Sequence, residues 1–362
     1  MKTKLHITTL LGIAALASVF AQGPLTPPGA PGPTMKTLDQ LEARTPISSA
    51  PFTIAQSGSY YLAANLNVTS GTAITITANN VTLDLNGFKI SSTAFGGGTG
   101  SAILIQSAKN VAIYNGHIEG REVFDNAFLH GINSSNSPVN VRVTDVSVFG
   151  CGLNGINLGD NFSTVVERCT VDLVGGEGIR AGAGAVRHST TTRCGGIGIV
   201  ATTASDCYGH STSETGLYAL SAENCYGAGG GSGDGVSAET ARNCYGKSSR
   251  IGVIARTTEN CYGTSNGAFP TFGVSANSAL NCYGNADSGY GVKAGTAQNC
   301  YGTSNSGNGV HAEVAHNCNG TSFTGTGVHF SFIGAMCYGR RNSPVADDYV
   351  LGGGLAGPVN LP

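Results

Sequence analysis

The sequence predicts an all-β solenoid, a chain that coils so that each short strand pairs with the equivalent strand of the next turn. Three observations predict it. Glycine contributes 55 of 362 residues without the strict three-residue period of collagen, short stretches alternate apolar and polar residues, and the tripeptide Cys-Tyr-Gly recurs at a nearly constant spacing. A charged fraction of 11% with a net charge of -2 is unlike a disordered chain. The abundance of Gly, Ser, Thr and Asn argues against a helical bundle.

The first 21 residues have the pattern of a secretory signal peptide: Lys2 and Lys4, then an apolar run from Leu10 to Phe20, then Ala21 before Gln22. The run is shorter than the roughly 18 residues that a transmembrane helix needs. We therefore expect export, to the periplasm, the cell surface or the medium, with no membrane span. Of 19 basic residues, 17 remain without Lys2 and Lys4, against 21 acidic ones. That balance gives nucleic-acid binding no electrostatic driving force.

The next segment, 22–45, is predicted to be a linker and a short N-terminal cap. It opens with QGPLTPPGAPGPT, whose prolines and glycines preclude a helix or a packed strand. Thr37 and Gln40 then have the spacing of a capping box. We expect the solenoid to occupy 46–340 and a C-terminal tail to occupy 341–362.

Short strands with one buried face are predicted from Pro51 onward. The alternating stretches are 73–76, 81–85, 102–105, 111–113, 139–143 and 146–148. No helical stretch separates them, although parallel strands usually need long crossovers. The stretches therefore form either antiparallel hairpins or a coil that winds on itself.

The internal repeats favour the coil. Cys-Tyr-Gly begins at residues 207, 225, 244, 261, 282, 300 and 337, with Cys318-Asn319-Gly320 as a variant, and the successive separations are 18, 19, 17, 21, 18, 18 and 19 residues. A second motif, Gly-Val-x-Ala, lies between them and begins at 235, 273, 291 and 309. Each repeat thus carries two short strands and forms one turn of a solenoid. We expect roughly a dozen turns.

The repeats also predict which side chains point inward. Aligning them with Val146-Ser147-Val148 puts the cysteines inside and the tyrosines outside. In the second motif, Val236 and Ala238 are expected to point in, and Gly235 and Ser237 to point out. An asparagine precedes most of the cysteines, and stacked asparagine amides are expected to bond one another at that bend: Asn224, Asn243, Asn260, Asn281, Asn299 and Asn317.

Two stretches carry a family resemblance. PFTI (51–54) with GSYYL (58–62), and NVTLDLNGF (80–88), resemble the opening of secreted bacterial right-handed parallel β-helix repeat proteins. These are similar in fold to pectate lyases and polygalacturonases. The resemblance implies a right-handed parallel β-helix over most of the chain and a carbohydrate context. It supplies no catalytic residue, because the opening motif is structural and a fold does not define an activity.

The 11 cysteines of an exported chain allow several interpretations. We favour a column of buried reduced thiols that act as small apolar groups. Disulfides between adjacent turns and a row of sites for soft metals remain open, although parallel Cβ directions suit a disulfide poorly. No Cys-x-x-Cys spacing indicates zinc.

The outward tyrosines are expected to form a ladder with about one ring per turn. The ladder could stabilise the sheet, stack on sugars or mediate self-assembly. As candidate substrate-binding residues we take Tyr208, Tyr226, Tyr245, Tyr262, Tyr283 and Tyr301.

The candidate catalytic residues lie in the more charged part of the chain, from Glu119 to Arg193. They are Arg180 or His130 as the base, with Asp160 and Glu177 holding a cation, and Asn133 and Asn157 as substrate-binding residues in the column of Arg180. The same residues could instead form a solvated face, because no three-carboxylate calcium cluster occurs on consecutive turns.

A later polar group could bind a metal or merely face solvent; its members are Tyr290, Lys293, Asn308, His311 and His329.

Two functions remain in view. The first is a secreted, non-catalytic solenoid that binds polysaccharide or a cell-surface glycan, or serves as a structural surface element. The second is a polysaccharide-active enzyme, a lyase on a uronic-acid glycan or a glycoside hydrolase. We expect no cofactor for the first, and Ca²⁺ for a lyase.

Overall fold

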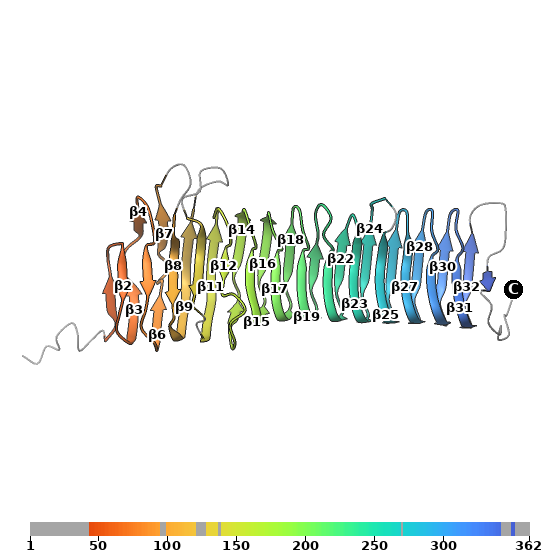
Figure 1. Ribbon diagram of the computed structural model, residues 1–362, viewed down its shortest axis with the longest axis horizontal. Helices are drawn as coiled ribbons and strands as arrows, with labels where there is room; N and C mark the ends of the chain where they lie inside the picture. Colours follow the sequence, from red (N-terminus) through yellow and green to blue (C-terminus); the bar gives the residue numbers. More distant parts are fainter. Residues whose placement is uncertain are drawn as a thin grey trace, which may run out of the picture. The chain divides into compact units, whose positions relative to one another are not determined.

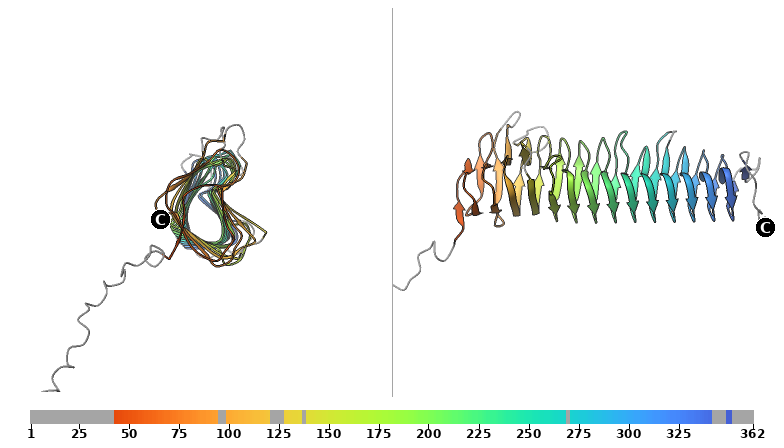
Figure 2. Two further views of the ribbon diagram at one scale, coloured as in Figure 1. Left: turned by 90° about the vertical axis from the view of Figure 1, so that its left-hand side faces the viewer. Right: turned by 60° about the horizontal axis from the view of Figure 1, so that its bottom comes forward.

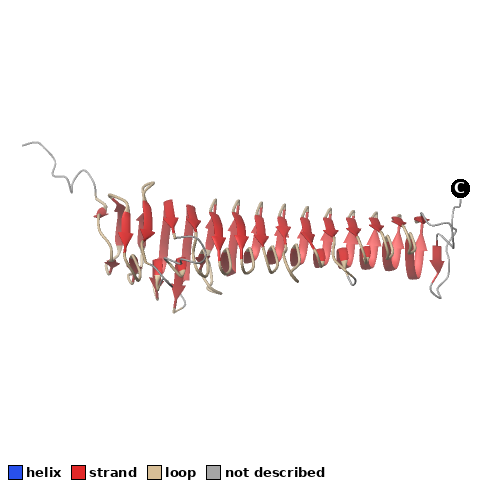
Figure 3. Cartoon of the chain, turned by 90° about the horizontal axis from the view of Figure 1, so that it is seen from above, coloured by secondary structure: helices blue, strands red, loops and turns tan. Residues whose placement is uncertain are grey.

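The structure is a computed structural model that describes residues 43–94, 99–120, 128–136, 139–268, 271–341 and 349–351. The predicted signal peptide, nearly all of the predicted linker and cap, and most of the predicted tail lie outside these residues, as do Thr37 and Gln40. The chain from Arg44 on forms one compact unit. Its described residues form strands and turns without helices (Figure 3). None of them belongs to a helix that could cross a membrane.

The strands of this unit stack along one axis (Figure 1), every registered pair is parallel, and the turns nearly superpose when seen along the axis (Figure 2). They form three ladders. The first ladder contains β2 (Phe52–Ile54), β5 (Ile74–Ile76), β8 (Ser101–Gln106), β10 (His130–Ser135), β12 (Ile156–Asn157), the first halves of β15 (Ile179–Arg187), β17 (Ile199–Ser205), β19 (Leu217–Glu223), β21 (Val236–Arg242), β23 (Ile251–Glu259), β25 (Phe272–Leu280), β27 (Tyr290–Gln298), β29 (Val310–His316) and β31 (Val328–Ala335), and β33 (Tyr349–Leu351).

The second ladder contains β1 (Thr45–Ile47), β3 (Gly58–Leu62), β6 (Val81–Asp84), the first halves of β9 (Lys109–Glu119) and β11 (Val139–Phe149), β13 (Val165–Glu167), and the second halves of the long strands from β15 to β31. The third ladder contains β4 (Leu66–Val68), β7 (Lys89–Ser92), the second halves of β9 and β11, β14 (Thr170–Val174), β16 (Thr190–Cys194), β18 (Tyr208–Ser211), β20 (Tyr226–Ala228), β22 (Tyr245–Ser248), β24 (Tyr262–Ser265), β26 (Tyr283–Ala286), β28 (Tyr301–Ser304), β30 (Asn319–Ser322) and β32 (Tyr338–Arg341). The predicted all-β parallel solenoid is confirmed, with about 15 turns in place of a dozen.

The interior changes character along the axis. Early turns are filled by large aliphatic side chains such as Ile54, Leu62 and Ile103, all fully buried. Later turns are filled by valine, alanine and cysteine, as the repeats predicted: Val274 and Cys261 are buried, and Tyr262 beside the cysteine faces outward. The same coil is thus closed around a wide core at one end and a narrow one at the other.

Glycine makes the narrow core possible. The glycine of each Cys-Tyr-Gly motif points inward and meets the backbone of the first ladder: a Cβ added to Gly246 would lie 1.9 Å from the oxygen of Gly252. The prediction that Gly235 points outward is wrong, because Gly235 is buried and its Cβ would lie 2.4 Å from the same oxygen. Two glycine columns therefore face each other across the core, where a side chain would not fit.

Ten of the eleven cysteines are buried, Cys337 is half-buried, and none of them is in a disulfide. Burial raises the pKa of Cys151, Cys169 and Cys194 to about 12, so these thiols stay protonated at neutral pH. The thiols bond to backbone carbonyls; that of Cys261, for instance, donates to the oxygen of Ala241 at 3.4 Å. They behave as small apolar groups with one satisfied donor.

The asparagine ladder is confirmed. Each asparagine before a cysteine has left-handed backbone angles, with a φ of 53° for Asn260, a conformation that asparagine tolerates better than most residues. Asn260 Nδ2 donates to Asn243 Oδ1 at 3.1 Å, and Asn281 Nδ2 donates to Asn260 Oδ1 at 3.1 Å. One amide column therefore bonds consecutive turns along this corner.

Candidate functional site

The structure brings the predicted catalytic residues together, with Arg180 at the centre. Arg180 Nη1 donates to Glu177 Oε1 at 2.8 Å, and Nη2 donates to Asp160 Oδ1 and Oδ2 at 3.0 and 3.1 Å. Arg180 lies in β15, Glu177 precedes that strand, and Asp160 follows β12 one turn earlier. The predicted column is also confirmed, because Asn133 pairs with Asn157 and Asn157 pairs with Arg180.

These contacts make Arg180 a poor base. Burial alone would lower the pKa of Arg180, but the carboxylates of Glu177 and Asp160 outweigh burial and raise it. A guanidinium so held does not give up its proton. Both carboxylates are already bonded to this cation, so the predicted role of Asp160 and Glu177 in holding a second cation has weak geometric support.

His130 belongs to the same hydrogen-bonded cluster. The backbone N–H of Asn154 donates to His130 Nδ1 at 3.4 Å, and Asn154 Nδ2 donates to Glu177 Oε2 at 3.3 Å. Burial lowers the pKa of His130, which favours the neutral ring. Since Nδ1 accepts a bond, the ring proton is placed on Nε2. The Nε2 of His130 then donates a proton and does not accept one. The remaining proton acceptors of the cluster are the carboxylates of Asp160 and Glu177, and both are bonded to Arg180.

The two predicted asparagines bond to each other. Asn157 Nδ2 donates to Asn133 Oδ1 at 3.0 Å, and Asn157 Oδ1 accepts the N–H of Gly159 at 3.1 Å. Part of their hydrogen-bonding capacity is therefore used within the protein, and the residue above them, Arg180, is occupied by its ion pairs.

The predicted tyrosine ladder exists, but its geometry is unsuited to sugar stacking. Adjacent rings lie parallel with centroids 4.7 to 5.1 Å apart along the column Tyr208, Tyr226, Tyr245, Tyr262, Tyr283 and Tyr301. Each inner ring has both faces covered by its neighbours, so edges and hydroxyls face the solvent. A sugar stacks on an exposed aromatic face. This stacking favours sheet stabilisation. The assignment of these six tyrosines as substrate-binding residues stays a prediction.

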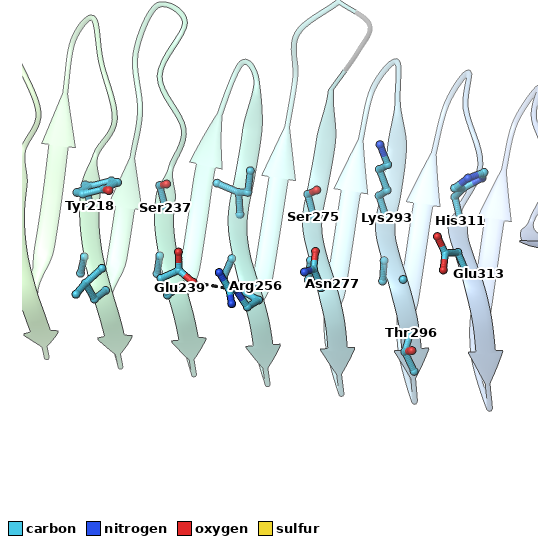
Figure 4. A pocket seen from close by; sticks show the side chains of 18 of the residues that line it. Tyr218, Ser237, Glu239, Arg256, Ser275, Asn277, Lys293, Thr296, His311 and Glu313 are labelled. Atoms are coloured by element: carbon cyan, nitrogen blue, oxygen red, sulfur yellow. Dashed lines mark ion pairs between the residues drawn. The ribbon is translucent and has the colours of Figure 1, made fainter.

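A groove that the sequence reasoning missed lies elsewhere on the solenoid. Its volume is about 960 Å³, and it follows the bend between the first and second ladders from β19 to β29. Figure 4 shows two rows of side chains on consecutive strands. The upper row includes Tyr218, Ser237, Ser275, Lys293 and His311, and the lower row includes Glu239, Arg256, Asn277 and Glu313.

The upper row continues the column of Arg180, since Arg180 pairs with Val200 and Val200 with Tyr218. The predicted residues thus occupy the earlier part of this column, and the groove lies along its later part. A signal was present, because the two rows vary from turn to turn while the Cys, Tyr and Asn columns beside them repeat. The concave bend itself depends on how two ladders meet, which the repeat does not reveal.

The groove is nearly neutral and mostly polar. Arg256 Nε pairs with Glu239 Oε2 at 3.0 Å, and Lys293 Nζ lies 4.8 Å from the ring centroid of Phe272. With Glu313, the groove-lining charges are two positive and two negative. Tyr218 is 47% exposed and lies beside the small Ser237, at one end of the groove.

The predicted late histidine group is a ring stack. The rings of Tyr290 and His311 are 4.6 Å apart, and those of His311 and His329 are 4.6 Å apart and nearly parallel. Asn308 Nδ2 lies 3.1 Å from His311 Nδ1. Burial, and then His329 and Lys293, lower the pKa of His311 to about 4. In the part of the chain that the structure describes, no three His, Cys, Asp or Glu side chains are placed to hold a metal ion.

Comparison with known proteins found similarity to three solved structures. No family model matches the sequence, and no curated protein matches it. The three structures are of the catalytic domain of GH87 alpha-1,3-glucanase in complex with nigerose, with TM-scores of 0.30, 0.28 and 0.30 and identities of 13, 12 and 13%. Each alignment covers 85% of this chain and 62% of the other, so the chain spans about three fifths of those domains. The site of this protein has to be argued from its own residues.

Proposed function

We propose that the protein binds a neutral, unbranched polysaccharide in the groove between the first and second ladders and does not cleave it. The observation that carries this proposal is the groove itself, an open and nearly neutral channel parallel to the solenoid axis. We also propose that the chain is exported, as its first 21 residues predict, and meets its glycan outside the cytoplasm.

The dimensions suit an extended glycan. The upper row from Tyr218 to His311 crosses five strand spacings, or about 24 Å at roughly 4.8 Å each. One pyranose unit of an extended chain advances by a similar distance. Several sugar units can therefore lie along the row in contact with successive turns.

The chemistry also suits a neutral sugar. Ser237, Ser275 and Asn277 supply hydroxyl and amide groups that bond to sugar hydroxyls, and Tyr218 supplies an exposed ring at the end of the row. Because Glu239 and Arg256 neutralise each other, the groove carries no excess of positive charge that would attract a polyuronate. These features favour a neutral glycan over an acidic one.

Catalysis is disfavoured by the positions of the carboxylates. Glycoside hydrolysis uses two carboxyl groups about 5 to 9.5 Å apart. The two acids of the groove, Glu239 and Glu313, are four strand spacings apart, about 19 Å. The alternative enzyme, a lyase acting through Arg180, Glu177, Asp160 and His130, needs a base, and the carboxylates that could serve, Glu177 and Asp160, are both bonded to Arg180.

The test is binding and product formation with the purified chain. Retention on a panel of insoluble neutral glycans, and calorimetry with their soluble oligomers, should show binding that Tyr218→Ala weakens at least tenfold. The matched control is Tyr262→Ala, which removes a ladder tyrosine of the same chemistry outside the groove and should leave affinity within twofold. Urea unfolding of both variants shows that each is folded.

Two results would overturn the proposal. Release of reducing ends or of unsaturated products would establish an enzyme, and loss of that product in Glu177→Gln would locate it at the earlier cluster. Binding that depends on Tyr262 and not on Tyr218 would move the site to the tyrosine ladder.

A further inference from the structure

A second depression lies on the second ladder in the earlier half; it extends from β11 to β17 and ends one turn before the groove begins at β19. Its volume is about 620 Å³, and its lining includes Arg142, Ser163, Thr164, Gly184, Thr202 and Thr203. Arg142, Val165, Ala185 and Thr203 are consecutive members of one column of the ladder. None of these residues lines the groove or belongs to the Arg180 cluster.

An irregularity of the solenoid builds this pocket. The register between β15 and β17 shifts between Ala181 and Ala185, which gives β15 two additional residues at Ala183 and Gly184. A Cβ on Gly184 would lie 2.0 Å from Thr164 Oγ1, so the bulge packs directly on the preceding loop. Bulges of this kind commonly redirect side chains next to functional sites.

Hydrogen bonds hold the loop beneath the bulge. Asn161 Nδ2 donates to the oxygen of Leu158 at 2.6 Å and to Ser134 Oγ at 3.2 Å, and Thr164 Oγ1 donates to the oxygen of Asn161 at 3.3 Å. Thr202 Oγ1 donates to the oxygen of Gly182 at 2.8 Å, on the other side of the pocket. The walls are therefore fixed before a ligand arrives.

The pocket carries a positive charge. Arg142 is exposed and is flanked in its column by Ala112 and Val165. The nearby acids are engaged elsewhere, because Asp145 and Glu167 both pair with Arg168 and Asp160 pairs with Arg180. Among the described residues, no carboxylate pairs with Arg142. Ser163, which is exposed and lies two residues before the partner of Arg142 in the ladder, adds a hydroxyl donor on the adjacent turn, whereas Thr203 lies three strand spacings along the column, about 14 Å away.

We propose that this pocket binds an oxyanion, with the guanidinium of Arg142 as its main donor and the hydroxyl of Ser163, on the adjacent turn, as its second donor. A planar guanidinium bonds a carboxylate, sulfate or phosphate group through two parallel hydrogen bonds, and such charge-assisted bonds are about twice as strong as neutral ones. The site does not depend on the proposed glycan groove, and either can fail without the other.

The test is titration of the full chain, at low ionic strength, with sodium sulfate, sodium phosphate and sodium galacturonate, followed by calorimetry and by amide chemical shifts. We expect saturable binding that Arg142→Gln weakens at least tenfold and Ser163→Ala weakens severalfold, whereas Thr203→Val, three strand spacings away, should change affinity less than twofold. The matched control is Arg187→Gln. Arg187 is an exposed arginine in β15 that does not line the pocket, so this substitution should change affinity less than twofold.

The three anions distinguish the sources. Tighter binding of galacturonate identifies the ligand group as the carboxylate of an acidic sugar, and tighter binding of sulfate or phosphate identifies a tetrahedral anion. Absence of saturation, or equal weakening by Arg142→Gln and Arg187→Gln, would show that the anions only respond to net surface charge and would overturn the proposal.

Discussion

The two halves of the solenoid close the same coil in different ways. In the early turns, the first and second ladders contain separate strands of uneven length. The core there is filled by isoleucine, leucine and Phe128, which include the largest fully buried side chains of the described chain. In the turns from Cys207 on, the core narrows to valine, alanine, cysteine and facing glycines. Those turns bury less apolar area per residue, so hydrophobic burial alone stabilises them less.

Stacked asparagine and tyrosine side chains offset the weaker hydrophobic burial of the later half. Each late turn adds amide bonds in the asparagine column and, from Tyr208 to Tyr301, a ring stacked in the tyrosine column. Such contacts contribute about 0.5–1.5 kcal/mol each, and they repeat at every turn. The comparison shows that a solenoid with small core residues can be stabilised by side-chain ladders between turns, provided that the repeat keeps each side chain in register.

The largest expected effect tests the facing glycines. Gly263→Ala should lower the free energy of unfolding by more than about 3 kcal/mol, because the added Cβ would lie 1.9 Å from the oxygen of Gly273. Urea unfolding measures this. Thr264→Ala is the matched control. Thr264 is the half-buried next residue of the same strand, and its hydroxyl has no hydrogen-bond partner among the described residues, so the midpoint should change little. Equal effects of the two substitutions would mean that the later turns are not closely apposed.

A smaller effect tests the asparagine column. Asn260→Ala removes two amide hydrogen bonds and places alanine at a φ of 53°, so unfolding should become easier by about 2 kcal/mol. Asn260→Gly removes the same bonds without the backbone strain and should lose less. If both variants match the parent in urea, the ladder does not supply the stability that the later half needs.

The smallest effect is the contribution of His311 to the pH dependence of stability. Since the pKa of His311 is lowered to about 4, against an ordinary value of 6.5, the unfolded chain binds the proton more readily than the folded one. Stability should be full above pH 6.5 and should fall as the pH drops toward 4. Urea midpoints at pH 7 and 5 measure this, and His311→Asn should reduce the difference. An unchanged difference in that variant would assign the acid sensitivity to another group.

Much of the fold follows from the repeat. A Cys-Tyr-Gly spacing near one turn, with alternation inside each stretch, is enough to place Cys261 inside and Tyr262 outside and to stack Asn260 on Asn243. The error at Gly235 has a physical cause: alternation assigns a side, but whether two sheets touch depends on how far apart they are. The paired recurrence of two glycines per repeat was the available signal.

The site was less predictable. The register that aligns Asn157 with Arg180 follows from the repeat, and so does the continuation of that column to Lys293 and His311. The groove does not, because it arises where two ladders bend around Glu239 and Arg256. The bulge at Gly184 likewise could not be predicted from the repeat spacing, since two additional residues there resemble ordinary variation in turn length.

Because the register is constant, the number of turns sets the length of the groove. A whole inserted repeat of 18 or 19 residues would lengthen the groove by one strand spacing, about 4.8 Å, and leave every existing contact in place. A single inserted residue within a strand would exchange inside for outside over that strand. Chains built on this plan can therefore change the length of ligand they accommodate in discrete steps, by duplication and deletion of turns.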